Sequence, residues 1–149
     1  MKKLKIMWLH SHLTLPSGGT KYVLQGIQEL SKNHSVDLFV QKASPEYEQL
    51  FKKSGINITV LSHRSTGDLK FWLNFSKQIK KEINFLKNRA KNYDLVVSSM
   101  FPMNVVASNL HLPHLQSCFQ PFAFFWDPNM ISKLPLKERL FVKFIKFRF

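Results

Sequence analysis

The sequence predicts an α/β domain with a Rossmann-like, mainly parallel sheet flanked by helices. The alternation of two kinds of segment and the length of the chain predict this fold class. Short apolar segments typical of buried strands alternate with longer segments whose apolar residues recur at helical spacing. This alternation favours parallel strands, because a crossover helix returns the chain to the same end of the sheet. A length of 149 residues provides one core of this kind.

Five segments are predicted to be strands and four to be helices. The strands are residues 4–9, 34–41, 56–61, 94–99 and 113–119. The helices are residues 20–32, 45–53, 65–92 and 103–109. In the first helix, Val23, Ile27 and Leu30 share one face, and the third helix is expected to run without a break. We expect residues 1–132 to form the domain and residues 133–149 to form a basic amphipathic helix.

The composition indicates an anionic partner. The formal net charge is +13, and the chain contains 14 phenylalanines. Nucleic acid, an anionic membrane surface and a phosphorylated substrate all fit this charge. No nucleic-acid-binding motif is present, so nucleic acid rests on charge alone. The single cysteine, Cys118, fits a reducing cytoplasm, and no apolar run reaches membrane-spanning length.

The adjacent glycines Gly18 and Gly19 follow the first strand and precede the first helix. Free backbone N–H groups and the positive end of a helix dipole are expected there, and glycine lets an anion reach the backbone. The alternative is a tight turn that requires a positive φ angle. The pattern is neither G-x-G-x-x-G nor the phosphate-loop pattern.

Three loops are expected to meet at the carboxyl edge of the sheet, where ligands of such folds bind. They follow the first, fourth and fifth strands, and they place Ser99 and Gln120 near the cleft. His10 and His12 have the spacing of two metal ligands on one strand face, but no carboxylate or cysteine lies nearby, so we predict no metal site. Asp127, followed by Pro128, is predicted to cap a helix.

These parts resemble the N-terminal half of family-4 glycosyltransferases of the GT-B fold. The resemblance rests on "KIMWLHSHLTLPSGG", "TKYVLQGIQELSKN", "HSVDLFV", "YDLVVSS" and "CFQPFAFFWDP". It implies retaining transfer of a hexose from a nucleotide-sugar to a glycan or lipid-linked acceptor, without a metal or other cofactor. Gly18 and Gly19 would approach the donor diphosphate, and Ser99 and Gln120 would lie on the acceptor side. The family's active-site His corresponds to Phe119 and its Arg to Ala123.

The resemblance also implies a second Rossmann-like domain that carries most of the nucleotide contacts. We therefore expect this chain to be a truncated half that is inactive alone, from a cytoplasmic enzyme of cell-surface polysaccharide synthesis. The alternative is a non-enzymatic basic α/β module that binds an anionic polymer or membrane surface.

The C-terminal tail is the second candidate for a binding surface. Leu140, Phe141, Phe144 and Ile145 can share one helical face, and the basic residues Arg139, Lys143 and Lys146 can share another. The apolar face is expected either to pack as core or to enter the inner face of the membrane, with the basic residues on anionic headgroups.

Overall fold

The fold was analysed in a computed structural model, which describes residues 2–14, 16–62, 69–117 and 127–148. The chain divides into two compact units, Met1–Phe119 and Gln120–Phe149, and each is described by itself. None of the helices in the described ranges is long and apolar enough to cross a membrane. The predicted domain boundary after residue 132 stays a prediction.

The first unit is the predicted parallel α/β sheet. Along the chain the elements are β1 (Lys5–Leu13), α1 (Gly18–Ser31), β2 (Ser35–Ala43), α2 (Pro45–Lys53), β3 (Asn57–Val60), α3 (Leu69–Leu73), α4 (Phe75–Ala90), β4 (Leu95–Ser99), α5 (Met103–Ser108) and β5 (His114–Ser117). The five strands are all parallel, in the order β3-β2-β1-β4-β5. The predicted fold class is therefore confirmed.

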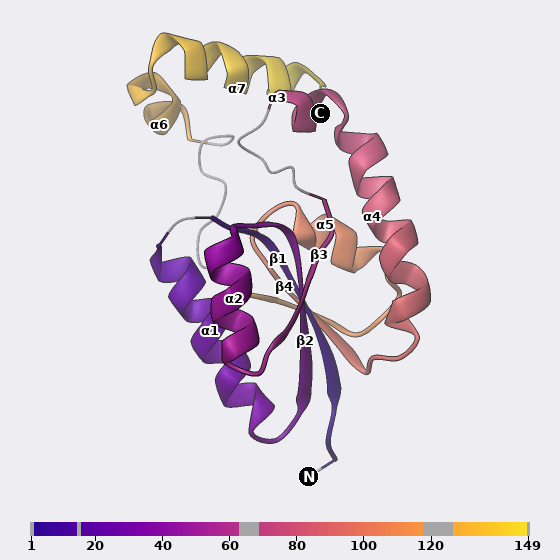
Figure 1. Ribbon diagram of the computed structural model, residues 1–149. Helices are drawn as coiled ribbons and strands as arrows, with labels where there is room; N and C mark the ends of the chain where they lie inside the picture. Colours follow the sequence, from indigo (N-terminus) through magenta and orange to yellow (C-terminus); the bar gives the residue numbers. More distant parts are fainter. Residues whose placement is uncertain (1, 15, 63–68, 118–126, 149) are drawn as a thin grey trace. The chain divides into compact units, whose positions relative to one another are not determined.

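Helices cover both faces of this sheet, α1 and α2 on one side and α4 and α5 on the other (Figure 1). Alternate residues of β1 face the two layers: Trp8 packs in the core beneath α1 and α2, while Met7 and Leu9 pack beneath α4 and α5. This double coverage explains why the strands read as continuous apolar runs in the sequence.

Two predicted helices differ from the structure. The first helix begins at Gly18, two residues earlier than predicted, because Ser17 caps it and its Oγ accepts a hydrogen bond from the Thr20 N–H at 3.2 Å. The long third helix is two helices, α3 and α4, since Asn74 between them leaves the helical conformation (φ −113°, ψ 18°). Its side chain donates to the Lys70 carbonyl instead of capping α4.

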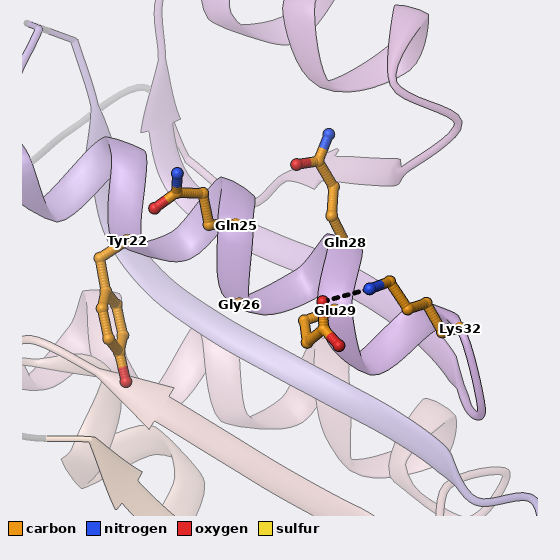
Figure 2. Close-up of a pocket in the computed structure, with 6 residues that line it drawn as sticks. All are labelled: Tyr22, Gln25, Gly26, Gln28, Glu29 and Lys32. Carbon is orange, nitrogen blue, oxygen red and sulfur yellow. Dashed lines mark ion pairs between the residues drawn. The ribbon is translucent and has the colours of Figure 1, made fainter.

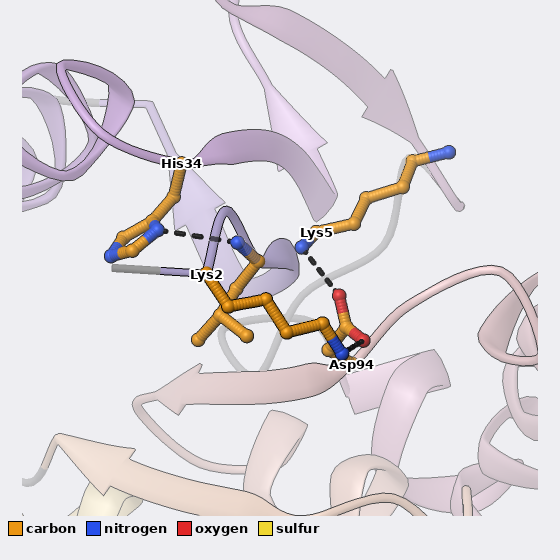
Figure 3. A network of polar contacts seen from close by, with 5 residues as sticks. Lys2, Lys5, His34 and Asp94 are labelled. Atoms are coloured by element: carbon orange, nitrogen blue, oxygen red, sulfur yellow. Dashed lines mark hydrogen bonds and ion pairs between the residues drawn. The ribbon is translucent and has the colours of Figure 1, made fainter.

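Polar contacts fix the start of the central strand between its two neighbours (Figure 3). The Leu4 N–H donates to His34 Nδ1 at 3.3 Å, just before β2, and the Lys5 N–H donates to Asp94 Oδ2 at 2.8 Å, just before β4. Lys2 adds an exposed ion pair to Asp94, which contributes little to stability. These contacts lie at the amino edge of the sheet and help to set its register.

The second unit contains α6 (Pro128–Lys133) and α7 (Leu136–Arg148). The predicted cap at Asp127 is confirmed: its Oδ1 accepts a hydrogen bond from the Asn129 N–H at 2.9 Å, and Pro128 occupies the first turn.

A buried carboxylate joins α4 to β2. Glu82 is only 2% exposed, and it accepts hydrogen bonds from Gln41 Nε2 (2.9 and 3.1 Å) and Gln78 Nε2 (2.7 Å). Burial raises the pKa of Glu82, against the opposing effect of hydrogen bonds from Gln78, Gln41 and Ser62. The Oε1 atom of Gln41 is buried and has no partner among the described residues. The folded state therefore disfavours the ionised form of Glu82.

We predict that Glu82→Gln stabilises the protein at neutral and alkaline pH. Because the folded pKa lies above the ordinary value of 4.5, the contribution of Glu82 is fully present below that value and is lost as pH rises through the folded pKa. Glutamine keeps the shape and one oxygen acceptor and removes the buried charge. Its NH₂ group would face the Gln41 Nε2 donor, so the Gln41 amide must turn over to present its unpartnered Oε1. Thermal unfolding across pH 4 to 9 should show a difference in Tm that opens as pH rises.

The matched control is Glu29→Gln, since the Glu29 side chain is 72% exposed and forms a surface ion pair with Lys32. Its effect is expected to stay within about 0.5 kcal/mol, as for most surface substitutions. Parallel pH curves for Glu82→Gln and the unmodified protein would contradict the assignment.

Candidate functional site

The candidate site lies where the strand order reverses. β1 is the central strand, and the chain continues outward from it through β2 on one side and through β4 on the other. Residues at the carboxyl ends of β1 and β4 are therefore adjacent, and His10 is in register with Ser99. Ligands of open α/β sheets bind beyond this point. The loop after β1 leads from it to the start of α1.

Ser99 is the centre of a buried hydrogen-bond network. Trp8 Nε1–H donates to Ser99 Oγ at 2.9 Å, and His10 Nδ1 lies 2.9 Å from the same oxygen. All three side chains are buried. Burial, followed by the nearby charge of His12, lowers the pKa of His10 to about 4, so this imidazole is neutral at physiological pH. The Ser99 hydroxyl thus holds an indole and an imidazole in place at the carboxyl edge.

His12 is the half-buried histidine of the site. Its Nδ1 lies 2.8 Å from the hydroxyl of buried Ser11, which also contacts Met100 Sδ at 3.9 Å. Burial, followed by the positive charge of Lys42, lowers the pKa of His12. A neutral, partly accessible imidazole can accept a hydrogen bond or a proton from a hydroxyl group. His12 is therefore the titratable group here that is suited to contact a substrate.

The turn after β4 is locally strained. Met100 has φ 72°, in the left-handed region that a non-glycine residue rarely occupies. Phe101 follows it and stacks on Trp72 of α3 and Phe75 of α4, with ring centroids 5.9 and 5.7 Å apart. This aromatic packing holds the turn beside the ends of β1 and β4, and such strain is common at functional sites.

The glycine pair forms the first turn of α1. Gly18 and Gly19 are helical, so the predicted alternative of a turn with positive φ is wrong; among the described glycines that conformation occurs at Gly55. The Ser17 hydroxyl accepts a hydrogen bond from the Thr20 N–H. The N–H groups of Gly18 and Gly19 have no hydrogen-bond partner among the described residues. Two donors therefore point out of the helix start.

Packing does not explain glycine at position 18 either. A Cβ atom placed on Gly18 would meet no atom within 4 Å, whereas one on Gly26 would lie 2.9 Å from Cη2 of Trp8. Gly26 is thus required by the close approach of a buried indole. Gly18 borders open space in front of unpartnered donors.

An open groove of about 680 Å³ runs along α1 (Figure 2). Its lining consists of Tyr22, Gln25, Gly26, Gln28, Glu29 and Lys32. Tyr22 also hydrogen-bonds Ser117 of β5, and Glu29 pairs with Lys32 across 2.6 Å. Of the predicted donor and acceptor residues that the structure describes, Gly18, Gly19 and Ser99 do not line this groove.

The structure brings together only part of the predicted site. Ser99 lies at the switch point and Gly18 and Gly19 at the start of α1, whereas Gln120, Phe119 and Ala123 lie outside the described residues. Within the described ranges, no three His, Cys, Asp or Glu residues lie close enough to hold a metal ion. Sequence reasoning missed the Trp8–His10–Ser99 network. Its signal was the run of Trp8, His10 and His12 at every second position of β1.

Neither a protein-family model nor a curated protein sequence matches the chain. Solved structures of glycosyltransferases do match its fold. A Phytolacca americana UGT2, complexed with UDP-2-fluoroglucose and pterostilbene, aligns with TM-score 0.59 and 12% identity over 91% of this chain and 36% of its own. The glycotransferase of kitacinnamycin aligns with TM-score 0.56 and 16% identity over 79% of this chain and 31% of its own.

A third match shares the same architecture. Anabaena HepE, in complex with UDP-glucose, aligns with TM-score 0.53 and 15% identity over 76% of this chain and 28% of its own. The chain thus spans about a third of the length of the structures it resembles. At these identities the likeness concerns the fold: the first unit has the fold of one Rossmann-like half of a GT-B glycosyltransferase.

Proposed function

We propose that this chain is the acceptor-side half of a glycosyltransferase that moves a sugar from a nucleotide-sugar to a glycan or lipid-linked acceptor. The observation that carries the proposal is the start of α1. There, at the end of the loop that leaves the switch point of the sheet, the backbone N–H groups of Gly18 and Gly19 have no partner among the described residues, and a Cβ atom on Gly18 would meet no atom within 4 Å. Such a helix start suits a diphosphate. The GT-B fold and the nucleotide-sugars bound to two of the similar structures support the same donor class.

Within this proposal the residues have distinct roles. Gly18 and Gly19 donate to the donor diphosphate, and His12 orients an acceptor hydroxyl through its neutral imidazole. Ser99 supports the cleft by holding His10, and Gln120 stays the predicted acceptor contact of the following loop. Retaining stereochemistry, an acceptor of cell-surface polysaccharide synthesis and a cytoplasmic site of action follow from the family-4 resemblance and are part of the proposal.

The function is tested by assaying sugar transfer from a panel of nucleotide-sugars by the two-domain protein that the proposal requires, in which a second Rossmann-like half is joined to this chain. We expect transfer by the two-domain protein and none by the 149-residue chain alone. Stabilising the departing nucleoside diphosphate requires several donors around the phosphates, and most of these are expected on the second half.

Two outcomes would contradict the proposal. Turnover by the isolated chain would show that its site is complete without a second half. Absence of both transfer and nucleotide-sugar binding, together with retention on an anionic polymer such as heparin, would favour the basic α/β module instead.

Gly19→Val is predicted to weaken donor binding about tenfold or more in the two-domain protein. A β-branched side chain at the helix start would crowd the approach of the phosphates, and a hydrogen bond to a charged group contributes about 1.5–3 kcal/mol. Titration calorimetry with the nucleotide-sugar measures the effect.

Gln25→Val is the matched control, because Gln25 is an exposed residue of the same helix, beyond its first turn. It also places a β-branched valine side chain on α1, without touching the helix start. Equal donor affinities for the two variants would leave Gly19 with a structural role only.

A further inference from the structure

The face that α7 leaves exposed differs in part from the predicted one. Leu136, Leu140 and Phe144 are 64%, 58% and 41% exposed, and their spacing of four places them along one side of the helix. Phe141, expected on the same face, is half-buried, and Val142 is 6% exposed. The helix therefore has a stripe of large apolar side chains in solvent, defined here as Leu136, Leu140 and Phe144.

Basic side chains border this stripe on both sides. At 100° per residue, Lys143 lies beside the Leu136 edge and Lys137 beside the Phe144 edge, and both lysines are exposed. Arg139, one of the predicted membrane contacts, is half-buried, so Lys137 replaces it as a contact. From residue 127 to 148 the sequence has six basic and two acidic residues.

We propose that α7 binds to an anionic lipid bilayer, lying in the plane of its surface. An anionic polymer would pair with the lysines but offer no apolar phase for the stripe. A bilayer offers both, because the apolar side chains enter the acyl boundary while the lysines extend to the headgroups. A helix of 13 residues is about 20 Å long, shorter than the hydrocarbon core of about 30 Å, so α7 would lie along the surface. This inference does not depend on sugar transfer.

The test is co-sedimentation of the 149-residue chain with two kinds of vesicle. One is phosphatidylcholine alone, and the other is an equimolar mixture of phosphatidylcholine and phosphatidylglycerol. We expect binding to the anionic vesicles, little binding to the neutral ones, and a loss of affinity as salt is raised. Equal binding to both would overturn the proposal.

Two double variants distinguish binding through α7 from attraction by the overall positive charge of the chain. Lys137→Gln with Lys143→Gln should weaken binding about 30-fold, from about 1 kcal/mol per basic residue near the surface and 1.4 kcal/mol per tenfold change. Lys80→Gln with Lys81→Gln removes the same charge from exposed positions of α4 and should cause a clearly smaller loss. Equal losses in the two variants would overturn the assignment to α7.

Leu140→Ser with Phe144→Ser tests the stripe itself. Both residues are exposed, so the fold should persist, which circular dichroism checks. Vesicle binding should fall at least as far as in the α7 lysine variant, and retained binding would contradict insertion of the stripe. Sedimentation velocity without lipid supplies the remaining outcome: a dimer that this variant dissociates would show that a second copy covers the stripe.

Discussion

The first unit depends on the burial of β1 on every side. This strand pairs with β2 along one edge and with β4 along the other, and helix layers cover both of its faces. Its backbone groups are therefore satisfied within the sheet, and its side chains must fit two cores at once. Because the neighbouring strands run parallel to it, the loops after β1 and β4 emerge together. The switch point and its site follow from that constraint.

Much of this arrangement could be predicted from the sequence, because strands buried on both faces leave continuous apolar runs and helices leave a 3.6-residue period. The fold class was predictable for that reason, and the Asp127 cap was predictable because Asp followed by Pro is preferred at a helix start. The break at Asn74 was not, since the apolar period continues across it. The ring contacts of Phe75 with Phe71, Trp72 and Phe101 show how the two helices pack. The start of α1 was missed because the sequence pattern places the glycine pair in the preceding loop, whereas Ser17 caps the helix and both glycines belong to its first turn.

The candidate site was likewise only partly predictable from the sequence. The sequence identified the glycine pair, but the fold itself does not require it. At position 18, neither a positive φ angle nor close packing demands glycine. The roles of His10 and His12 were not predictable, because two residues on the same face of one strand acquire different burial. His10 is held inside by Ser99, whereas His12 remains partly accessible beside Lys42. Tertiary burial, which no local pattern encodes, decides which of them can meet a ligand.

The central claim is that an anionic donor meets the carboxyl edge of this sheet at the start of α1. The most direct measurement is a two-dimensional NMR titration of the 149-residue chain with UDP-glucose, with amide shifts assigned residue by residue. The account predicts shifts concentrated at Gly18, Gly19 and Thr20 and near His12. Shifts confined to the amino edge around Lys5 and His34, or to the exposed lysines of α4, would contradict it.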